Sequence, residues 1–402
     1  MREYYTHVQH KDIKSNKFQS LPRKFRIGWF ANSFVDRSAT GTGRVAEELV
    51  KRFSKKYSDK FETFLICDQN TNIKAIAENV DFQNLHIVNL PKKKFRKFRS
   101  IRQYFAASRV FDEDLDLLHF LAPRQYPFFW HFPSRLFIST YHAAGDITAV
   151  ADKFVLSRHI FNLVGKYQNK HLNKIVAVSD PAAEEINQAY GISKDKIVSI
   201  PLGTDHLWEL PETERPEKEP YILIIGRWQK YKNVHRILEA IADCDTNNLL
   251  PKIVLIGKSQ VPGNELVKKE IMKITKDSIK CLDYVTDIQL KSYYQHSSLV
   301  IHPSVNEGFG WPPFEAFGEG AKILIHSGTP ASKYLNNQVG VTAVNLLDSK
   351  NAIYKAINDA MCPVSIDIST RRNFLKNIGC TWDSMIENYK ELYLKVLENI
   401  ND

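Results

Sequence analysis

Two glutamates, Glu307 and Glu315, stand eight positions apart in the segment HPSVNEGFGWPPFEAF. The residues between them are rich in glycine, proline and aromatic side chains, so the stretch is neither one regular helix nor one regular strand. An apolar run that stops near His302 predicts a strand, and Pro312 and Pro313 suit the start of a helix. We therefore expect Glu307 on a loop and Glu315 on the first helical turn. There the two carboxylates can accept hydrogen bonds from separated groups of one elongated ligand.

Short apolar runs alternate with longer amphipathic segments, which is typical of parallel strands joined by crossover helices. In the first half we predict strands at residues 25–31, 61–68, 85–90, 115–121, 135–142, 174–179 and 196–203. In the second half we predict strands at 221–227, 252–257, 279–285, 298–304, 321–327 and 339–346. Residues 205–220, rich in proline and charge, predict a linker between two domains.

The predicted fold class is α/β, with two Rossmann-like, doubly wound domains that face each other across a cleft. We expect an N-terminal domain at 1–205 and a C-terminal domain at 206–380. Apolar residues at helical spacing predict a closing helix within 381–402. Ligands of open parallel sheets bind beyond the carboxyl ends of the strands, so the loop of Glu307 is expected to face the cleft.

The composition predicts a soluble globular protein. Hydrophobic residues make up 43% of the 402 residues, and no run approaches the roughly 18 apolar residues of a membrane span. The amino-terminal segment has no apolar core of signal-peptide length, so the cytoplasm is the expected location. The five cysteines are scattered without a CxxC or Cys/His spacing. Neither a disulfide framework nor a zinc site is therefore predicted.

The formal charge of +10 predicts anionic partners, which admits nucleic acid, a membrane surface or a phosphate-bearing substrate. The basic run at 91–102 carries Phe95, Phe98 and Ile101 at a spacing of three. A solvated helix is the plainer interpretation of this run, and contact with an anionic membrane surface is the alternative. Nucleic acid is not expected as a partner, because no known nucleic-acid-binding module accompanies the charge.

The segment from Glu307 to Glu315 resembles the E-x7-E signature of the retaining glycosyltransferases of family 4. Its variant EGFGWPPFEA resembles the mannosyltransferase-type members. The similarity extends more loosely from residue 25 to the end, about nine tenths of the chain. It implies the GT-B architecture, in which the second domain mainly holds a nucleotide sugar and the first mainly holds an acceptor. A terminal helix then returns to the first domain.

The resemblance also implies roles for charged residues. Glu315 would hold the ribose hydroxyls, and Glu307 would contact hydroxyls of the transferred sugar. The segment GRWQKYKN matches an arginine and a lysine of the family, so Arg227 and Lys232 would face the diphosphate. Fixed cations there stabilise the charge that develops on the departing group. Lys230 competes with Lys232 for this role.

Further substrate contacts are expected from glycines. The segment SATGTGRVAEELV resembles the family's G-x-G-R loop, so Gly41 and Gly43 would let the backbone of the first domain approach the donor. Taken alone, such a glycine pair equally well permits only a tight turn. In the loop between the two glutamates, the backbone amides of Gly308, Phe309 and Gly310 would meet anionic oxygens.

Two histidines and a pair of D-x-D triplets complete the candidates. His142 ends the segment STYH, where family members have a histidine near the reacting sugar. The family usually has an aspartate next, whereas here Ala143 follows and Asp146 lies further on. His119 also stands near a strand end. The triplets in DEDLD, residues 112–116, bind metal in a different glycosyltransferase fold, and here we interpret them as a solvated loop.

These features predict a metal-independent, retaining glycosyltransferase that moves a hexose, with mannose favoured, from a nucleoside diphosphate sugar to an acceptor hydroxyl. The expected setting is assembly of a bacterial surface polysaccharide, and no cofactor or metal is expected. The expected partners are the nucleotide sugar, a saccharide or lipid-linked saccharide acceptor, and an anionic membrane surface at the inner face of the cell membrane. The resemblance implies front-face substitution, in which the leaving phosphate takes the acceptor proton and no nucleophile is required.

Three other classes compete with this prediction. A catalytically inactive nucleotide-sugar-binding protein would share the donor site, and a basic nucleic-acid-binding protein would share the charge. A dinucleotide-dependent oxidoreductase would share the doubly wound sheets. The chain has no clear GxGxxG followed by a ribose-binding acid, which disfavours the oxidoreductase.

Overall fold

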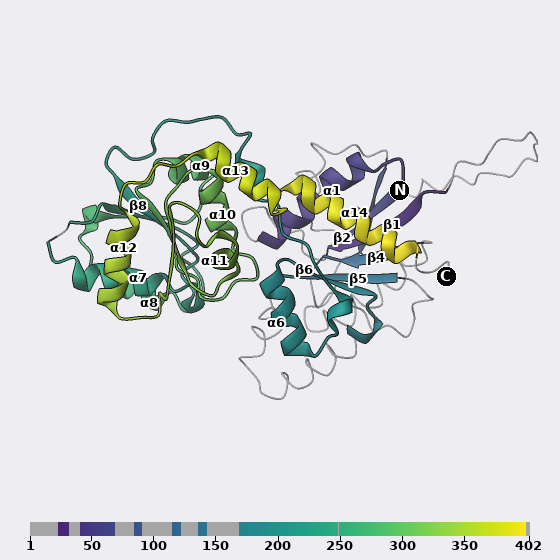
Figure 1. The fold of residues 1–402 in the computed structure, drawn as a ribbon, viewed down its shortest axis with the longest axis horizontal. Coiled ribbons are helices and arrows are strands. Elements are labelled where there is room, and N and C mark those ends of the chain that lie inside the picture. The colour runs from purple at the N-terminus through teal and green to yellow at the C-terminus, as the bar shows by residue number, and fades with distance from the viewer. Residues whose placement is uncertain are drawn as a thin grey trace, which may run out of the picture.

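The computed structural model describes residues 23–31, 41–68, 84–90, 115–121, 136–142, 169–247 and 249–398. The basic run at 91–102, together with Ala143 and Asp146, lies outside these ranges. Figure 1 shows two domains side by side, each with a sheet between helices.

The first domain is built on a parallel sheet whose described strands follow the order β3-β2-β1-β4-β5-β6-β7. They are β1 (Phe25–Ala31), β2 (Phe61–Asp68), β3 (Leu85–Leu90), β4 (Leu117–Phe120), β5 (Leu136–Tyr141), β6 (Lys174–Ala177) and β7 (Ile197–Ser199). Helix α1 (Gly41–Lys56) follows β1 along the chain, and α6 (Asp180–Tyr190) follows β6. Every residue of β4 and β5 is buried, as a parallel sheet with covered faces requires.

The second domain repeats this design with the strand order β10-β9-β8-β11-β12-β13. Its strands are β8 (Tyr221–Ile225), β9 (Lys252–Ile256), β10 (Ile279–Leu282), β11 (Leu299–His302), β12 (Ile323–His326) and β13 (Val341–Val344). Its helices are α7 (Val234–Cys244), α8 (Glu265–Ile271), α9 (Asp287–Gln295), α10 (Trp311–Gly318), α11 (Pro330–Leu335), α12 (Lys350–Ala360) and α13 (Ile368–Asn377). The strand order reverses between β1 and β4 in one sheet and between β8 and β11 in the other, and ligands of such sheets bind beside these reversals.

The predicted fold class is confirmed, because both sheets are parallel and doubly wound. Several strands end earlier than their apolar runs: β11 ends at His302 rather than at residue 304, and the residues that follow it form a loop. One local expectation was wrong. Glu315 is the fifth residue of α10 and lies in its second turn, because the helix already begins at Trp311, ahead of the two prolines.

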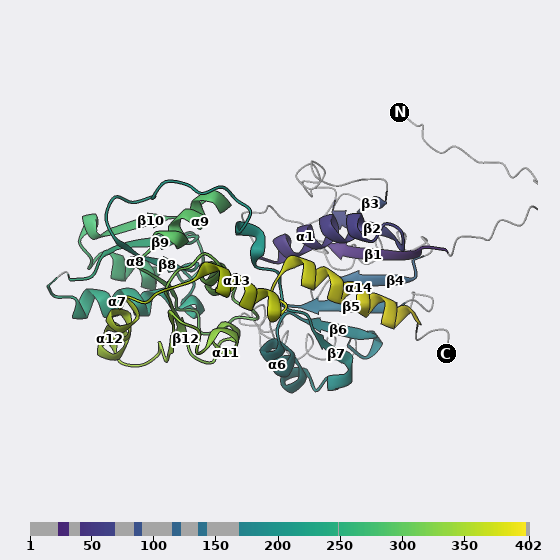
Figure 2. The same ribbon diagram turned by 45° about the horizontal axis from the view of Figure 1, so that its top comes forward.

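The chain crosses between the domains twice, and α14 (Trp382–Glu398) brings it back to the first domain (Figures 1 and 2). The two crossings are bonded to each other, since the amide of Trp382 donates to the Asp205 carboxylate over 2.8 Å. Further along α14, the hydroxyl of Tyr393 accepts a hydrogen bond from Trp29 of β1 over 3.0 Å. These contacts fix α14 to the first domain and hold the two crossing segments together.

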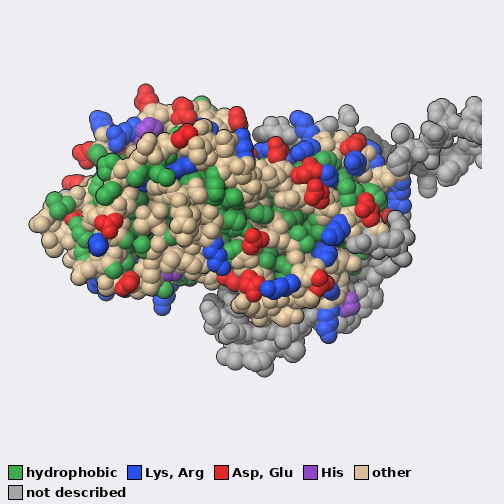
Figure 3. All heavy atoms as spheres, in the orientation of Figure 1, with side chains coloured by type: hydrophobic (Ala, Val, Ile, Leu, Met, Phe, Trp, Pro, Cys, Tyr) green, Lys and Arg blue, Asp and Glu red, His purple; other side chains and the backbone are tan. Residues whose placement is uncertain are grey.

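None of the helices within the described ranges is long and apolar enough to cross a membrane. On the face drawn in Figure 3, basic and acidic side chains are interspersed rather than separated by sign. The described part of that face therefore presents no single cationic surface.

Candidate active site

A cavity of about 680 Å³ opens where the strand orders reverse, and residues of both domains line it. Cavities of this size are typical of sites for small molecules. The predicted residues that line it are Gly41, His142, Arg227, Lys232, Glu307, Gly308, Phe309, Gly310 and Glu315. Arg227 follows β8 and Glu307 follows β11, so the strand-order reversal of the second sheet places these two together.

Glu307 is largely buried, with 15% of its side chain exposed, and lies between two basic side chains. Its carboxylate is paired with the Lys232 ammonium and lies 3.2 Å from Nε2 of His302. Burial would raise the pKa of Glu307, but Lys232 and His302 outweigh burial and hold this pKa at about 2. The carboxylate is therefore ionised at neutral pH. Lys232 has three donors, so it can keep Glu307 and still meet an anionic oxygen.

Glu315 is held by groups from several elements. Tyr294 of α9 donates to its carboxylate over 2.7 Å, and Nε2 of His206 lies 3.1 Å away. His206 contacts the carboxylate outside hydrogen-bond geometry, and within the described residues neither of its ring nitrogens makes a hydrogen bond. We therefore treat this contact as electrostatic.

The charge of Glu315 follows from the same neighbours. Burial would raise the pKa of Glu315, but His206, with help from Arg44, outweighs burial and lowers it. Tyr294 lowers it as well. Glu315 is therefore an ionised carboxylate at the cavity wall, able to accept hydrogen bonds from two adjacent hydroxyls.

The loop between the two glutamates has an unusual backbone at its end. Gly310 is the N-cap residue that precedes α10, and its φ is +85°, a conformation that residues with a side chain rarely adopt. The carbonyl of Gly308 accepts a hydrogen bond from Ser179 of the first domain over 2.5 Å. The loop is thus fixed at both domains, and it lies beside the open amino-terminal end of α10, which favours anions.

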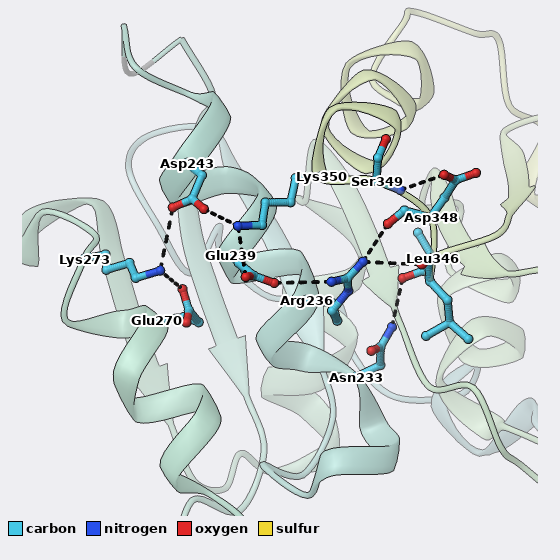
Figure 4. Close-up of polar contacts among 11 residues, drawn as sticks. Asn233, Arg236, Glu239, Asp243, Glu270, Lys273, Leu346, Asp348, Ser349 and Lys350 are labelled. Atoms are coloured by element: carbon cyan, nitrogen blue, oxygen red, sulfur yellow. Dashed lines mark hydrogen bonds and ion pairs between the residues drawn. The ribbon is translucent and has the colours of Figure 1, made fainter.

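Lys232 is the last residue of the short helix η6 (Lys230–Lys232), and the residue after it determines the direction of the chain. Asn233 is buried with φ of +58°, and its side-chain amide donates to the Leu346 carbonyl over 3.2 Å. Figure 4 shows Asn233 pointing to Leu346, beside ion pairs that join Asp243 of α7 to Lys350 of α12 and to Lys273, which follows α8. This arrangement holds the turn that carries Lys232 into the cavity.

We expect Asn233→Ala to lower turnover by at least about tenfold, because the turn that carries Lys232 would shift, and a small displacement of a catalytic group lowers the reaction rate strongly. The substitution puts alanine, which lacks the polar side chain that lets asparagine adopt positive φ, in this conformation, at a cost on the order of 1 kcal/mol, and it removes the bond to Leu346. The exposed Asn337, with φ of +67°, provides a matched control. Asn337→Ala should lose comparable stability and keep full turnover. Melting temperatures and steady-state kinetics test this, and equal turnover of the two variants would contradict it.

The two glycines of the first domain differ in position. Gly41 begins α1 at the cavity wall, and a Cβ there would lie 3.0 Å from the ring of Trp311. This glycine therefore permits close approach of the two domains across the cavity. Gly43 is buried in the first turn of α1 and is not one of the cavity-lining residues.

The two histidines also differ. His142 lines the cavity, with Nε2 3.2 Å from the carbonyl of Leu121. His119 is fully buried, and its nitrogens contact the hydroxyls of Tyr393 at 2.7 Å and Thr140 at 2.8 Å. Burial, with the nearby His142, lowers the pKa of His119 to about 3. His119 is therefore a neutral core residue that joins the sheet to α14.

The part of the acidic triplets that the structure describes lies away from the cavity. Asp116 precedes β4, accepts a hydrogen bond from the Arg26 amide over 2.7 Å and pairs with Arg23. Asp116 therefore lies at the amino-terminal ends of the strands, opposite the cleft. Asp112 and Asp114 lie outside the described residues. All five cysteines are free thiols.

Four functional candidates were missed from the sequence: Arg44, His206, Tyr294 and His302. The last two stand in ordinary strand or helix patterns. Arg44 was visible as the fourth residue of the G-x-G-R match, which is the signal that could have found it. His206 lies in the segment interpreted as a linker, where no local pattern distinguishes it.

The cavity wall combines charges of both signs. Its cations are Arg44, Arg227, Lys232 and Lys258, and its carboxylates are Asp283, Asp287, Glu307 and Glu315. Cations suit a phosphate group, whereas ionised carboxylates suit hydroxyl or amide donors. One wall can therefore hold a ligand that carries a diphosphate between hydroxyl-rich parts.

Each half of the chain matches the model of a known protein family. Residues 39–206 match the family model described as Glycosyltransferase Family 4, and residues 209–365 match the model described as Glycosyl transferases group 1. The boundary between the two matches falls at the first crossing between the domains.

Characterised relatives are distant. The chain is 25% identical over 201 residues to the O-antigen chain mannosyltransferase RfbU of Salmonella typhimurium, a match that covers 50% of this chain and 54% of that protein. It is 22% identical over 237 residues to the O-antigen chain mannosyltransferase B of Escherichia coli, covering 54% of this chain and 61% of that protein. The chain thus matches only about half of the length of these relatives.

Solved structures share the fold over nearly the whole chain. A glycosyltransferase from Rickettsia africae superposes with a TM-score of 0.69 at 16% identity, covering 94% of this chain and 99% of that one. Anabaena HepE in complex with UDP-glucose gives 0.66 at 15% identity, covering 92% and 99%. WaaG, a glycosyltransferase involved in lipopolysaccharide biosynthesis, gives 0.60 at 14% identity, covering 90% and 94%. These likenesses establish the GT-B fold.

Proposed function

The chain belongs to the GT-B glycosyltransferases described by the family 4 and group 1 models, and we propose that it transfers a hexose from a nucleoside diphosphate sugar to an acceptor hydroxyl. The observation that carries this proposal is the placement of Arg227, Lys232, Glu307 and Glu315 on one cavity wall. Two of these groups suit a diphosphate, and the other two suit sugar hydroxyls on either side of it.

The proposed reaction retains the configuration of the transferred sugar. The bond between the anomeric carbon and the phosphate oxygen breaks, and a bond from that carbon to the acceptor oxygen forms on the same face. The acceptor proton passes to the leaving phosphate oxygen. Arg227 and Lys232 stabilise the negative charge on the departing diphosphate, so positioning and electrostatics supply most of the catalysis.

In this proposal Glu315 holds the ribose, Glu307 holds the transferred sugar, and the amides of Gly308, Phe309 and Gly310 lie near the phosphates. His142 lines the acceptor side of the cavity and lies near the reacting sugar. The reaction uses neither a metal nor a cofactor, since the protein's own cations take the charge of the leaving group.

Mannose is the favoured sugar of this proposal, and assembly of a bacterial surface polysaccharide is its setting. Support comes from the two relatives, which are named as O-antigen chain mannosyltransferases. The acceptor is a saccharide or a lipid-linked saccharide. We place the reaction at the inner face of the cell membrane, where the charge of +10 favours anionic lipid, and sedimentation with anionic and neutral vesicles tests this placement.

A panel of GDP- and UDP-hexoses identifies the donor. At about 100 times its dissociation constant, the true donor should add about 2.7 kcal/mol to the free energy of unfolding, which thermal unfolding detects. A catalytically inactive nucleotide-sugar-binding protein would show the same stabilisation but no turnover. If no nucleotide sugar stabilises the parent, the assignment of the cavity is wrong.

A further inference from the structure

Arg44 connects the first domain to the nucleotide-binding side of the second. It lies in the first turn of α1, and Nη2 is 2.7 Å from Oδ1 of Asp287, the first residue of α9. Both residues line the cavity, and only 15% of the Arg44 side chain is exposed. Since 33% of the Asp287 side chain is exposed, the ion pair is partly buried, and a partly buried pair is screened less than a surface pair.

Helix α9 links the Arg44–Asp287 ion pair to Glu315. Seven residues after Asp287, Tyr294 is fully buried and donates to the Glu315 carboxylate. The same helix holds the linker between the domains, because Lys291 donates to the Leu210 carbonyl over 2.6 Å and Ser292 to the Glu214 carbonyl over 2.8 Å. Helix α9 therefore touches the first domain, the linker and the carboxylate that we assign to the ribose.

Electrostatics gives Arg44 a second effect on the same end of the cavity. Among the residues that the structure describes, four carboxylates and four cations line the wall, and Arg44 is the one of these four cations that lies in the first domain. Arg44 interacts favourably with both Asp287 and Glu315, so its removal would leave each carboxylate with less compensating positive charge. Among these residues the carboxylates would then outnumber the cations by four to three, which weakens the attraction of the wall for a diphosphate.

We propose that Arg44 is a positioning residue that ties α1 to α9 through Asp287 and so couples the approach of the two domains to nucleotide binding. This inference rests on the proposed function, since it concerns the same cavity. It differs from a direct role of Arg44 on the phosphate, because the effect is transmitted through Asp287 and α9.

A double-mutant cycle on the full chain separates these two roles. We expect Arg44→Ala to weaken UDP or GDP binding, measured by calorimetry, on the order of tenfold, within the range typical of coupling between sites. Asp287→Ala should weaken it comparably, and the double variant should be no weaker than either single variant. Arg52→Ala is the matched control, because Arg52 lies on the same helix and is not a cavity-lining residue. Its partners are Glu48 of α1 at 2.8 Å and Asp383 of α14 at 3.9 Å. It should bind nucleotide like the parent.

Small-angle X-ray scattering adds a measurement that requires no ligand. The radius of gyration of ligand-free Arg44→Ala should exceed that of the parent and of Arg52→Ala, since the domains separate more readily. Additive losses in the cycle, or an unchanged radius of gyration in Arg44→Ala, would overturn the proposal. If the parent binds nucleotide and Arg44→Ala expands as described, but the parent transfers no sugar, the proposed function fails and this inference stands.

Discussion

Lys232→Ala and Arg227→Ala should each lower turnover by about tenfold to a thousandfold, which corresponds to losing about 1.4 to 4 kcal/mol of transition-state stabilisation. Both cations line the cavity beyond β8, where the diphosphate is expected. The charge on that group grows as the glycosidic bond breaks, so the loss should appear mainly in kcat. Steady-state kinetics with the donor found in the panel measures it.

Lys230 provides the control for this prediction. It stands two residues before Lys232 on the same short helix, but it is exposed and is not a cavity-lining residue. Lys230→Ala should therefore keep the parent rate. If the Lys232 and Arg227 variants fold and also turn over at the parent rate, the diphosphate does not lie between these cations.

Glu315→Gln and Glu307→Gln should have large and different effects. Glu315→Gln should weaken binding of the free nucleoside diphosphate by about tenfold or more, because the buried carboxylate that we propose as the acceptor of two ribose hydrogen bonds is lost. Glu307→Gln should spare that binding and lower transfer, since Glu307 is assigned to the transferred sugar. Glutamine preserves the volume of both buried side chains. Calorimetry with the nucleoside diphosphate and with the intact donor separates the two effects.

Glu319→Gln is the matched control for the glutamate pair. Glu319 follows α10 one turn after Glu315, is buried, and pairs with Arg372 over 3.2 Å. Its loss should reduce stability and leave nucleotide affinity unchanged. Equal loss of nucleotide affinity in Glu307→Gln and Glu315→Gln would refute the division of roles between them.

Much of the architecture follows from local sequence. Strands such as 25–31 and 61–68 were predicted to their observed bounds, because parallel strands buried on both faces leave continuous apolar runs. The placement of Arg227 and Glu307 also follows, since Arg227 lies two residues after β8 and Glu307 lies in the loop after β11, and the carboxyl ends of parallel strands share one edge. The segment of Glu315 was assigned to a helix correctly, although the helix begins earlier than expected.

The connections across the cavity were beyond sequence reasoning. Arg44 and Asp287 are 243 positions apart, and their ion pair depends on how two domains meet. His206 reaches Glu315 only because the linker folds against α10, and a proline-rich stretch gives no sign of that contact. His119 was a candidate at a strand end, but the returning α14 buries it beneath Tyr393.

Sugar transfer by the parent protein tests the central claim most directly. Each donor that stabilises the protein, GDP-mannose first, is supplied with a radiolabelled hexose and with free or lipid-linked saccharide acceptors. The parent should release nucleoside diphosphate and form labelled saccharide in equal amounts, with the anomeric configuration of the donor retained, and Lys232→Ala should form far less. A parent protein that binds its nucleotide sugar yet forms no labelled product with any acceptor, or forms a product of inverted configuration, would contradict a retaining glycosyltransferase.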